Sequence, residues 1–317
     1  MKNKDICTKI DIIYDIPTDY VVFSVDENKC YYGKNRSGEI VFMIPSKSAK
    51  SNSFCQETKA LLFYNNKKCT FTLDGIPVTK TMHIFVCKER AKDKIDAFVR
   101  LTHAFSVSES ENDTYYVAKL FSAISMLFDR QRQISEIEIQ GLFAELFVIL
   151  HFYKRGCRID KHWQSRSRMT FDFSIDEKCR LEIKSTLKNS RIHHFRHDQL
   201  LSELYDIKIV SLMLQKNDRG ISLGELIASV RETFSDNFAL LLRIEQIACQ
   251  IDEEQLFFYR YDKTYAEQNM RFFDAEKIPH FREKTPEGVF NAEYDCCLDN
   301  VGAISEKTMI EWLTRCG

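Results

Sequence analysis

Asp172, Glu182 and Lys184 are the residues whose types and spacing best fit a chemical role. They lie in the segment MTFDFSIDEKCRLEIKST, residues 169–186. Two carboxylates held close together repel each other and need a proton or a cation between them. A hard divalent ion such as Mg²⁺, for which Mn²⁺ could substitute, is commonly held by one or two carboxylates with waters and phosphate oxygens. With a lysine beside it, such an ion could assist the hydrolysis of a phosphodiester.

A β-hairpin over residues 169–187 would position these side chains. Apolar and polar residues alternate on both sides of a polar turn centred on Glu177. Closing the strands symmetrically about that turn sets Phe173 opposite Leu181 and Asp172 opposite Glu182. A slip of one residue would place apolar side chains opposite polar ones, so burial favours this register. The alternative is an ordinary hairpin whose charged residues face water.

Glu145 lies in a predicted helix, EIEIQGLFAELFVILHFYKRG, that precedes the hairpin. Almost every neighbour of Glu145 is apolar, so the helix should be buried on nearly all sides. A buried carboxylate is rare unless it is paired. We therefore expect Glu145 to point at a partner, either the metal ion at the hairpin or an Arg or Lys elsewhere.

Positive charge is concentrated around these elements, although the net charge of the chain is −1. Residues 151–200 contain 12 Lys and Arg but 6 Asp and Glu, and the rest of the chain is correspondingly acidic. Such a distribution is typical of a surface that binds a polyanion such as DNA. A solvated basic face is the alternative.

Four candidate nucleic-acid-binding residues follow the second strand: Arg191, His193, Arg196 and Gln199. Arginine binds phosphate in a bidentate manner, and Gln199 could bind a water or a phosphate. The spacing of His193 and His197 would suit a zinc site, but no Cys or Glu follows in a recognisable zinc pattern. Contacts with phosphate are the simpler interpretation.

The length of 317 residues suggests two domains. Residues 1–108 contain short β-branched and aromatic runs that predict strands at 20–25, 39–44, 60–65, 69–73 and 82–87, separated by the turn-like stretches GKNRSG, YNNKK and DGIP. This pattern predicts a β-rich N-terminal recognition or interaction domain. Residues 109–317, with helical and strand patterns, would form the second domain. Expected helices cover residues 92–106, 113–133, 221–234 and 237–247, expected later strands cover 208–215, 255–261 and 292–299, and Ser305 should cap a terminal helix.

Eleven cysteines show no paired or zinc-type spacing, which predicts reduced thiols and a cytoplasmic protein. The N-terminus lacks a signal-peptide pattern. No window of about 18 apolar residues is present, so we expect no membrane span.

The hairpin and its flanking segments resemble the PD-(D/E)XK nuclease superfamily, and within it a family of PD-(D/E)XK motif proteins from bacterial restriction and phage-defence loci. The matching pieces are GLFAELFVIL, Trp163, FDF, LEIKST and SRIHHFRHDQL. Phe171 stands where the superfamily's name has Pro. The downstream tyrosine, Tyr205, does not have the spacing of the Q-x-x-x-Y variant from Gln199.

The resemblance implies an α+β (α/β) fold with a mixed sheet flanked by helices, beginning near residue 134. It also implies that Asp172 and Glu182 bind metal, that Ile183 lends its backbone carbonyl, and that Lys184 serves the nucleophilic water. Glu145 would be an accessory ligand.

Three functions remain open on the sequence. The first is an Mg²⁺-dependent DNA endonuclease of a restriction or phage-defence system. The second is a non-catalytic nucleic-acid-binding or scaffold subunit that retains the fold, and the third is a nuclease acting on RNA or on branched or single-stranded DNA. The chain has no Walker loop or methyltransferase motif, so ATPase or methyltransferase subunits would be partners. Cutting both strands of a duplex with one site per chain would suggest a homodimer.

Overall fold

The computed structural model describes the chain except for residues 2, 28, 47–52, 109–113, 129–133, 164–169, 202–203, 284 and 289–290. The fold is mixed α+β, with several sheets and helices, and is consistent with a PD-(D/E)XK-like fold. Two compact units are formed: Met1–Arg132 with Phe234–Gln250, and Gln133–Thr233 with Ile251–Gly317. The sequence predicted two domains with a boundary between residues 108 and 109, and this boundary stays a prediction.

The first unit contains a mainly antiparallel sheet in the order β1-β2-β3-β6-β5-β4. Its strands are β1 (Tyr20–Val25), β2 (Cys30–Asn35), β3 (Ile40–Pro45), β4 (Phe54–Glu57), β5 (Leu61–Leu73) and β6 (Ile76–Cys87). Strand β1 also runs parallel to the end of β5, with Tyr20 opposite Phe71. The helices of this unit are α1 (Asn3–Asp11), α2 (Lys92–Ser108), α3 (Thr114–Phe128) and α7 (Phe238–Ala248).

Both faces of this sheet are buried, which explains the continuous apolar runs in its strands. Tyr32 and Phe42 belong to a core shared with the helices, whereas Tyr31 and Val41 belong to a core on the other face. The strands expected at residues 20–25, 39–44 and 82–87 are confirmed.

Two expectations in this unit were wrong. Segments 60–65 and 69–73 form one strand, because β5 continues through YNNKK with an irregularity between Tyr64 and Lys67. The stretch GKNRSG was expected to be a turn, yet its first residues belong to β2. Gly33 disguised that strand, and it is needed there because a Cβ atom would lie 1.9 Å from the carbonyl oxygen of Val21.

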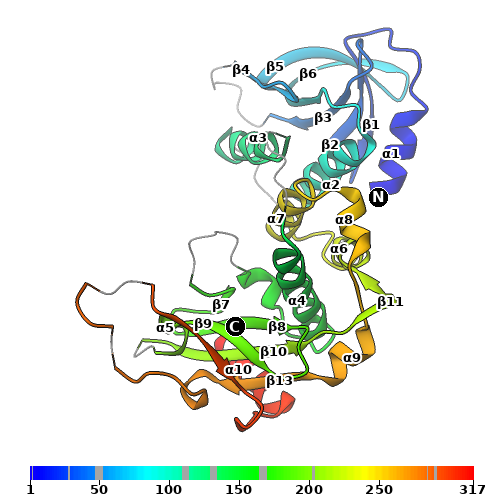
Figure 1. Ribbon diagram of the computed structural model, residues 1–317. Coiled ribbons are helices and arrows are strands. Elements are labelled where there is room, and N and C mark those ends of the chain that lie inside the picture. Colours follow the sequence, from blue (N-terminus) through cyan, green and yellow to red (C-terminus); the bar gives the residue numbers. More distant parts are fainter. Residues whose placement is uncertain are drawn as a thin grey trace. The chain divides into compact units, whose positions relative to one another are not determined.

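The second unit contains a mixed sheet in the order β13-β10-β8-β7. Its strands are β7 (Phe173–Ser174), β8 (Cys179–Thr186), β10 (Asp206–Met213) and β13 (Met270–Asp274). Strands β8 and β10 are parallel, and the other neighbours are antiparallel. Helix α4 (Glu136–Tyr153) packs against β8 (Figure 1), where Gln140 Nε2 donates a hydrogen bond to Ser185 Oγ at 3.0 Å.

The ends of α4 follow from its sequence. Ser135 accepts a hydrogen bond from the backbone N–H of Glu138, and the Glu138 side chain accepts from the backbone N–H of Ser135. This capping box satisfies donors that the first turn leaves unpaired. Beyond the last turn, Gly156 adopts φ +83°, a conformation that favours glycine. The predicted helix at 136–156 is thus confirmed to within three residues.

The remaining elements surround this sheet. They are η1 (Ile159–His162), β9 (Ile192–Arg196), α5 (His197–Leu200), β11 (Lys216–Ser222), α6 (Leu223–Thr233), α8 (Glu253–Phe258), β12 (Arg260–Tyr261), α9 (Lys263–Gln268), η2 (Ala275–Lys277), β14 (Glu293–Cys297) and α10 (Glu306–Cys316). The expected strand at 255–261 was wrong over its first half, which is helical in α8. Ser305 caps α10 as expected, accepting a hydrogen bond from the backbone N–H of Thr308 at 3.0 Å.

Cys179 and Cys316 are joined by a disulfide that links the start of β8 to the last turn of α10. The expectation that all cysteines are reduced was therefore wrong for this pair. The two residues are 137 positions apart, so no local spacing could reveal the pairing. In the part of the chain that the structure describes, no helix is both long and apolar enough to cross a membrane.

Candidate active site

The hairpin of β7 and β8 has the register expected from the sequence. Phe173 lies opposite Leu181, and Ser174 lies opposite Arg180. Before Phe173, hydrogen bonds between backbone N–H groups and carboxylate side chains link the two segments. The backbone N–H of Asp172 donates to Glu182 Oε2 at 3.2 Å, and the backbone N–H of Ile183 donates to Asp172 Oδ2 at 2.7 Å. The two carboxylates are thus held against the same stretch of β8.

A second group of contacts fixes Glu182 and Lys184. Lys184 Nζ lies 2.7 Å from Glu182 Oε1 and donates to Gln199 Oε1 at 3.1 Å. Gln199 Nε2 donates to Glu182 Oε1 at 2.7 Å. The Gln199 amide also bonds to the backbone at Thr170 and Arg196. Glu182 and Gln199 are buried, at 4% and 5% exposed, and a buried ion pair needs such additional hydrogen bonds.

Crowding of carboxylates dominates the electrostatics at Asp172. Burial raises the pKa of its carboxyl well above the usual range, and the charges of Glu182 and then Glu145 raise it further. The hydrogen bond from Ile183 N–H and the charge of Lys184 oppose this pKa shift without cancelling it. An ionised Asp172 is therefore unfavourable here unless a cation lies beside it.

Glu145 projects from α4 and is half-buried. Its Oε2 accepts a hydrogen bond from the indole Nε1–H of Trp163. Trp163 itself pairs with Phe173 in an isolated β-bridge, next to Asp172. Glu145 was expected to point at the metal ion or at an Arg or Lys, whereas the hydrogen bond described here comes from an indole. The charge of Glu145 also acts on the pKa of Asp172.

The donors in this cluster suit a hard divalent ion. Asp172 and Glu182 offer carboxylate oxygens, which Mg²⁺ and Mn²⁺ prefer. The N–H and C=O of a strand residue point to the same edge, so the Ile183 carbonyl faces the Asp172 side of β8.

The three carboxylates are not packed as a complete ligand set. A group of three possible metal ligands has its ligand atoms all within 4.8 Å of one another. Among the described residues this group is Asp176, Cys179 and Cys316, and its two sulfurs are bonded to each other. Glu145, Asp172 and Glu182 do not form such a group. Without movement, at most two of these carboxylates could bind one ion directly.

Arg191 and His193 lie inside the protein instead of on its surface. Arg191 donates to the carbonyl oxygen and Oγ of Ser211 at 3.1 and 2.9 Å, and to the carbonyl oxygen of Asn269 at 2.6 Å. His193 Nε2 lies 2.7 Å from Ser211 Oγ. Burial, with the nearby charges of Lys184 and Arg191, lowers the pKa of His193 to about 4, so this ring is neutral at neutral pH.

Arg196 is more accessible, with 42% of its side chain exposed, and it pairs with Asp198 at 2.8 Å. The structure therefore brings Gln199 into the carboxylate cluster and leaves Arg196 beside it. It places Arg191 and His193 around Ser211, which lies opposite Lys184 in the pairing of β8 with β10.

The roles of Trp163 and Ser211 in this arrangement were missed by reasoning from spacing. A buried indole needs a partner for its N–H, and Trp163 is 9% exposed. That rule and the place of Trp163 among the residues that match the family were the available signals, and neither names Glu145 as its partner. Ser211 gave no signal, because it lies within an ordinary apolar strand.

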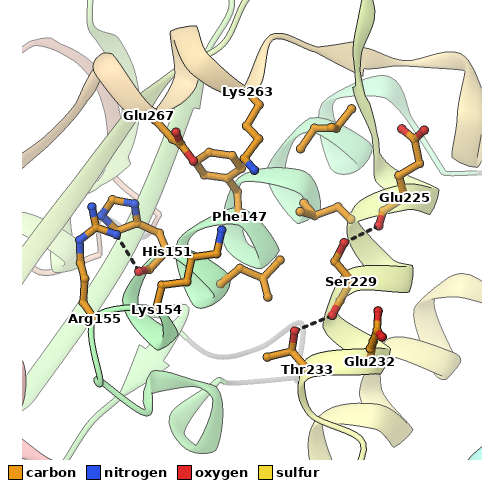
Figure 2. A pocket seen from close by; sticks show the side chains of 13 residues that line it. Phe147, His151, Lys154, Arg155, Glu225, Ser229, Glu232, Thr233, Lys263 and Glu267 are labelled. Atoms are coloured by element: carbon orange, nitrogen blue, oxygen red, sulfur yellow. Dashed lines mark hydrogen bonds between the residues drawn. The ribbon is translucent and has the colours of Figure 1, made fainter.

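A separate cavity of about 370 Å³ lies along α4, α6 and α9 (Figure 2). Phe147 and Leu150 contribute apolar surface, and Lys154, Lys263 and Glu232 are among the charged lining residues. Phe147 follows Glu145 by two positions, about 200° around the helix, so the cavity adjoins the other side of α4. None of the predicted site residues lines this cavity. The candidate site is therefore identified by the cluster of Asp172, Glu182 and Lys184, and not by the cavity.

A family model described as "Putative PD-(D/E)XK family member, (DUF4420)" matches residues 18–299. No curated protein matches the chain. No solved structure matches it either.

Proposed function

Because this chain belongs to the DUF4420 family, we propose that it is a divalent-metal-dependent nuclease that hydrolyses phosphodiester bonds in DNA. One observation carries the proposal. Asp172, Glu182 and Lys184 meet on adjoining stretches of one hairpin, and Gln199 bonds to both Glu182 and Lys184. A hairpin that merely faced water would have no need of this buried network.

Asp172 and Glu182 would hold the ion, together with the carbonyl oxygen of Ile183. Glu145, held at the edge of the cluster, would reach it through a water. When bound, Mg²⁺ or Mn²⁺ neutralises charge at the phosphate and lowers the pKa of a water. The raised pKa of Asp172 supports this assignment, since a cation would remove the cost of ionising a third carboxylate among its neighbours.

Lys184 would orient the attacking water and stabilise negative charge that develops on the phosphate. Its ammonium is held between Glu182 and Gln199 and lies 5.1 Å from the centre of the Phe195 ring. Contacts on three sides leave the ammonium little freedom. Such preorganisation is what transition-state stabilisation requires.

Arg196 is the best-placed of the expected phosphate-binding arginines, because its side chain is partly exposed beside Gln199. Arg191 and His193 would support the site from inside, since their polar atoms are engaged with Ser211. A role in restriction or phage defence is proposed from the resemblance alone, and a cytoplasmic location from the cysteine pattern of the sequence. Methyltransferase or ATPase partners are proposed because the sequence shows no motif for those activities, and a homodimer because each chain would carry one site.

A nicking and cutting assay tests the proposal. Supercoiled plasmid, modified phage DNA and RNA are incubated with the protein and Mg²⁺ or Mn²⁺, beside an EDTA control. Asp172→Ala should abolish cleavage, whereas Asp198→Ala removes an exposed carboxylate near the site and should retain it. Cleavage of RNA alone would change the substrate assignment. Wild-type protein that binds DNA but takes up no Mn²⁺ and cuts no substrate would favour a non-catalytic binding or scaffold subunit.

A further inference from the structure

Trp163 connects the two elements that carry the candidate site. Its backbone pairs with Phe173 at the start of the hairpin, and its indole N–H donates to the carboxylate of Glu145 on α4. The side chain is buried, at 9% exposed. One residue thus ties the helix to the strand that begins beside Asp172.

This contact helps to hold the Glu145 carboxylate beside the hairpin. A carboxylate on a half-buried helical face could rotate away from two other carboxylates, because like charges repel. The backbone bridge of Trp163 to Phe173, the residue next to Asp172, instead keeps the bonded Glu145 carboxylate on the side of α4 that faces the hairpin. The indole N–H is an uncharged donor, so it can fix the Glu145 carboxylate without neutralising it as a lysine or arginine would.

We propose that Trp163 is a positioning residue that holds Glu145 at the edge of the Asp172–Glu182 pair, where Glu145 strengthens divalent-ion binding through a bridging water. The proposal rests on the proposed nuclease function. It goes beyond it by assigning an organising role to a residue that would touch neither the ion nor the substrate. Residues that orient metal ligands typically change metal affinity by about 10–100-fold when they are replaced.

The two tryptophans of this chain make the contact directly observable. They are Trp163 and Trp312, and the Trp312 N–H donates to Asp206 Oδ2 at 2.7 Å. In protein labelled with ¹⁵N at the indole nitrogens, Trp312→Phe identifies the remaining signal as that of Trp163. Glu145→Gln should move this Trp163 signal. Titration with Mg²⁺ should also move it, and by more than the signal of Trp312.

Mn²⁺ affinity, measured by calorimetry, then tests the role of Trp163. Trp163→Phe keeps an aromatic ring but removes the donor, and it should weaken Mn²⁺ binding about tenfold. Trp312→Phe is the matched control and should leave the affinity unchanged. In a Glu145→Gln background, Trp163→Phe should add no further loss, because a residue that acts only through Glu145 has nothing left to position.

The outcomes separate this inference from the proposed function. Wild-type protein that binds no Mn²⁺, even with DNA, would overturn both. Normal Mn²⁺ binding by wild type and by Trp163→Phe would overturn the role of Trp163 alone. An equal loss in the presence and absence of Glu145 would show that Trp163 acts through packing instead. If Trp163→Phe does not fold, the indole signal decides: a Trp163 resonance unaffected by Glu145→Gln would refute the inference.

Discussion

Replacing Asp172 by Asn should stabilise the metal-free protein at neutral pH while abolishing metal-dependent activity. Burial, Glu182 and Glu145 raise the pKa of the Asp172 carboxyl. A carboxyl with a raised pKa in the folded state stabilises the protein below its unfolded pKa, and this contribution is lost as pH rises through the folded value. At neutral pH the ionised form therefore lowers the free energy of unfolding. Asn removes the charge and keeps an oxygen that can accept from Ile183 N–H.

The magnitude follows from the repulsion removed. Two charges about 5 Å apart at an effective dielectric constant of about 20 repel by roughly 3 kcal/mol. Lys184 and the Ile183 N–H already offset part of this repulsion. We therefore expect Asp172→Asn to raise the free energy of unfolding by about 1–3 kcal/mol. Since 1 kcal/mol shifts Tm by about 2–4 °C in a domain of this size, the increase in Tm should be on the order of 5 °C.

Calorimetry in EDTA between pH 4 and 8 measures this increase. The increase in Tm of Asp172→Asn over wild type should be largest at neutral pH and shrink as acid protonates Asp172 in the wild type. Saturating Mn²⁺ should reverse the difference, because only the wild type binds the ion. Asp176→Asn is the matched control. Asp176 accepts backbone N–H bonds from Lys178 and Cys179, which lower its pKa, so its replacement should lower Tm at neutral pH. A metal-free Asp172→Asn protein no more stable than wild type at pH 7 would refute the argument.

Three further predictions concern residues around the cluster. Lys184→Ala should bind Mn²⁺ in calorimetry yet lose about 10²–10³-fold in turnover, because its charge acts mainly in the transition state; unchanged turnover would remove Lys184 from the mechanism. Arg196→Ala should weaken DNA binding on all sequences and reduce the slope of log K against log salt by about 1. Arg191→Ala should leave that slope unchanged but lower Tm, because the buried acceptors at Ser211 lose their donor. Cys316→Ser should lower the free energy of unfolding by roughly 2–4 kcal/mol under oxidising conditions, and no difference from wild type would show that the disulfide does not form in solution.

The hairpin register could be predicted because two independent constraints agree. Alternation on each strand fixes which side chains share a face, and the apolar pairs allow one alignment. Phe173 opposite Leu181 is sufficient to set the alignment that brings Asp172 to Glu182. Helix α4 was equally accessible, because Ser135 and Glu138 form a capping pattern that is local in sequence.

The positions of Arg191 and His193 could not be predicted in this way. A count of charges along a segment assumes that its basic side chains reach the surface. Both residues instead meet Ser211, and Arg191 also reaches Asn269, 78 positions further along the chain. A guanidinium with several protein acceptors can be buried at acceptable cost, and acceptors that far away leave no trace in local spacing. Charge clustering along the chain therefore could not predict that these two side chains are buried.

The structure explains why residue 199 is a glutamine, although its spacing in the sequence was ambiguous. Because its spacing from Tyr205 departs from the Q-x-x-x-Y pattern, that pattern could not predict where Gln199 lies in the fold. In the folded chain its oxygen accepts from Lys184 while its nitrogen donates to Glu182. A carboxylate at this position could accept from Lys184 but would add another negative charge next to Glu182, and a lysine or arginine could donate to Glu182 but would repel Lys184. Only a side chain with both a donor and an acceptor satisfies both neighbours without adding charge. The amide of glutamine therefore matches the ion pair that it fixes, and the orientation of that amide follows from the charges of Lys184 and Glu182.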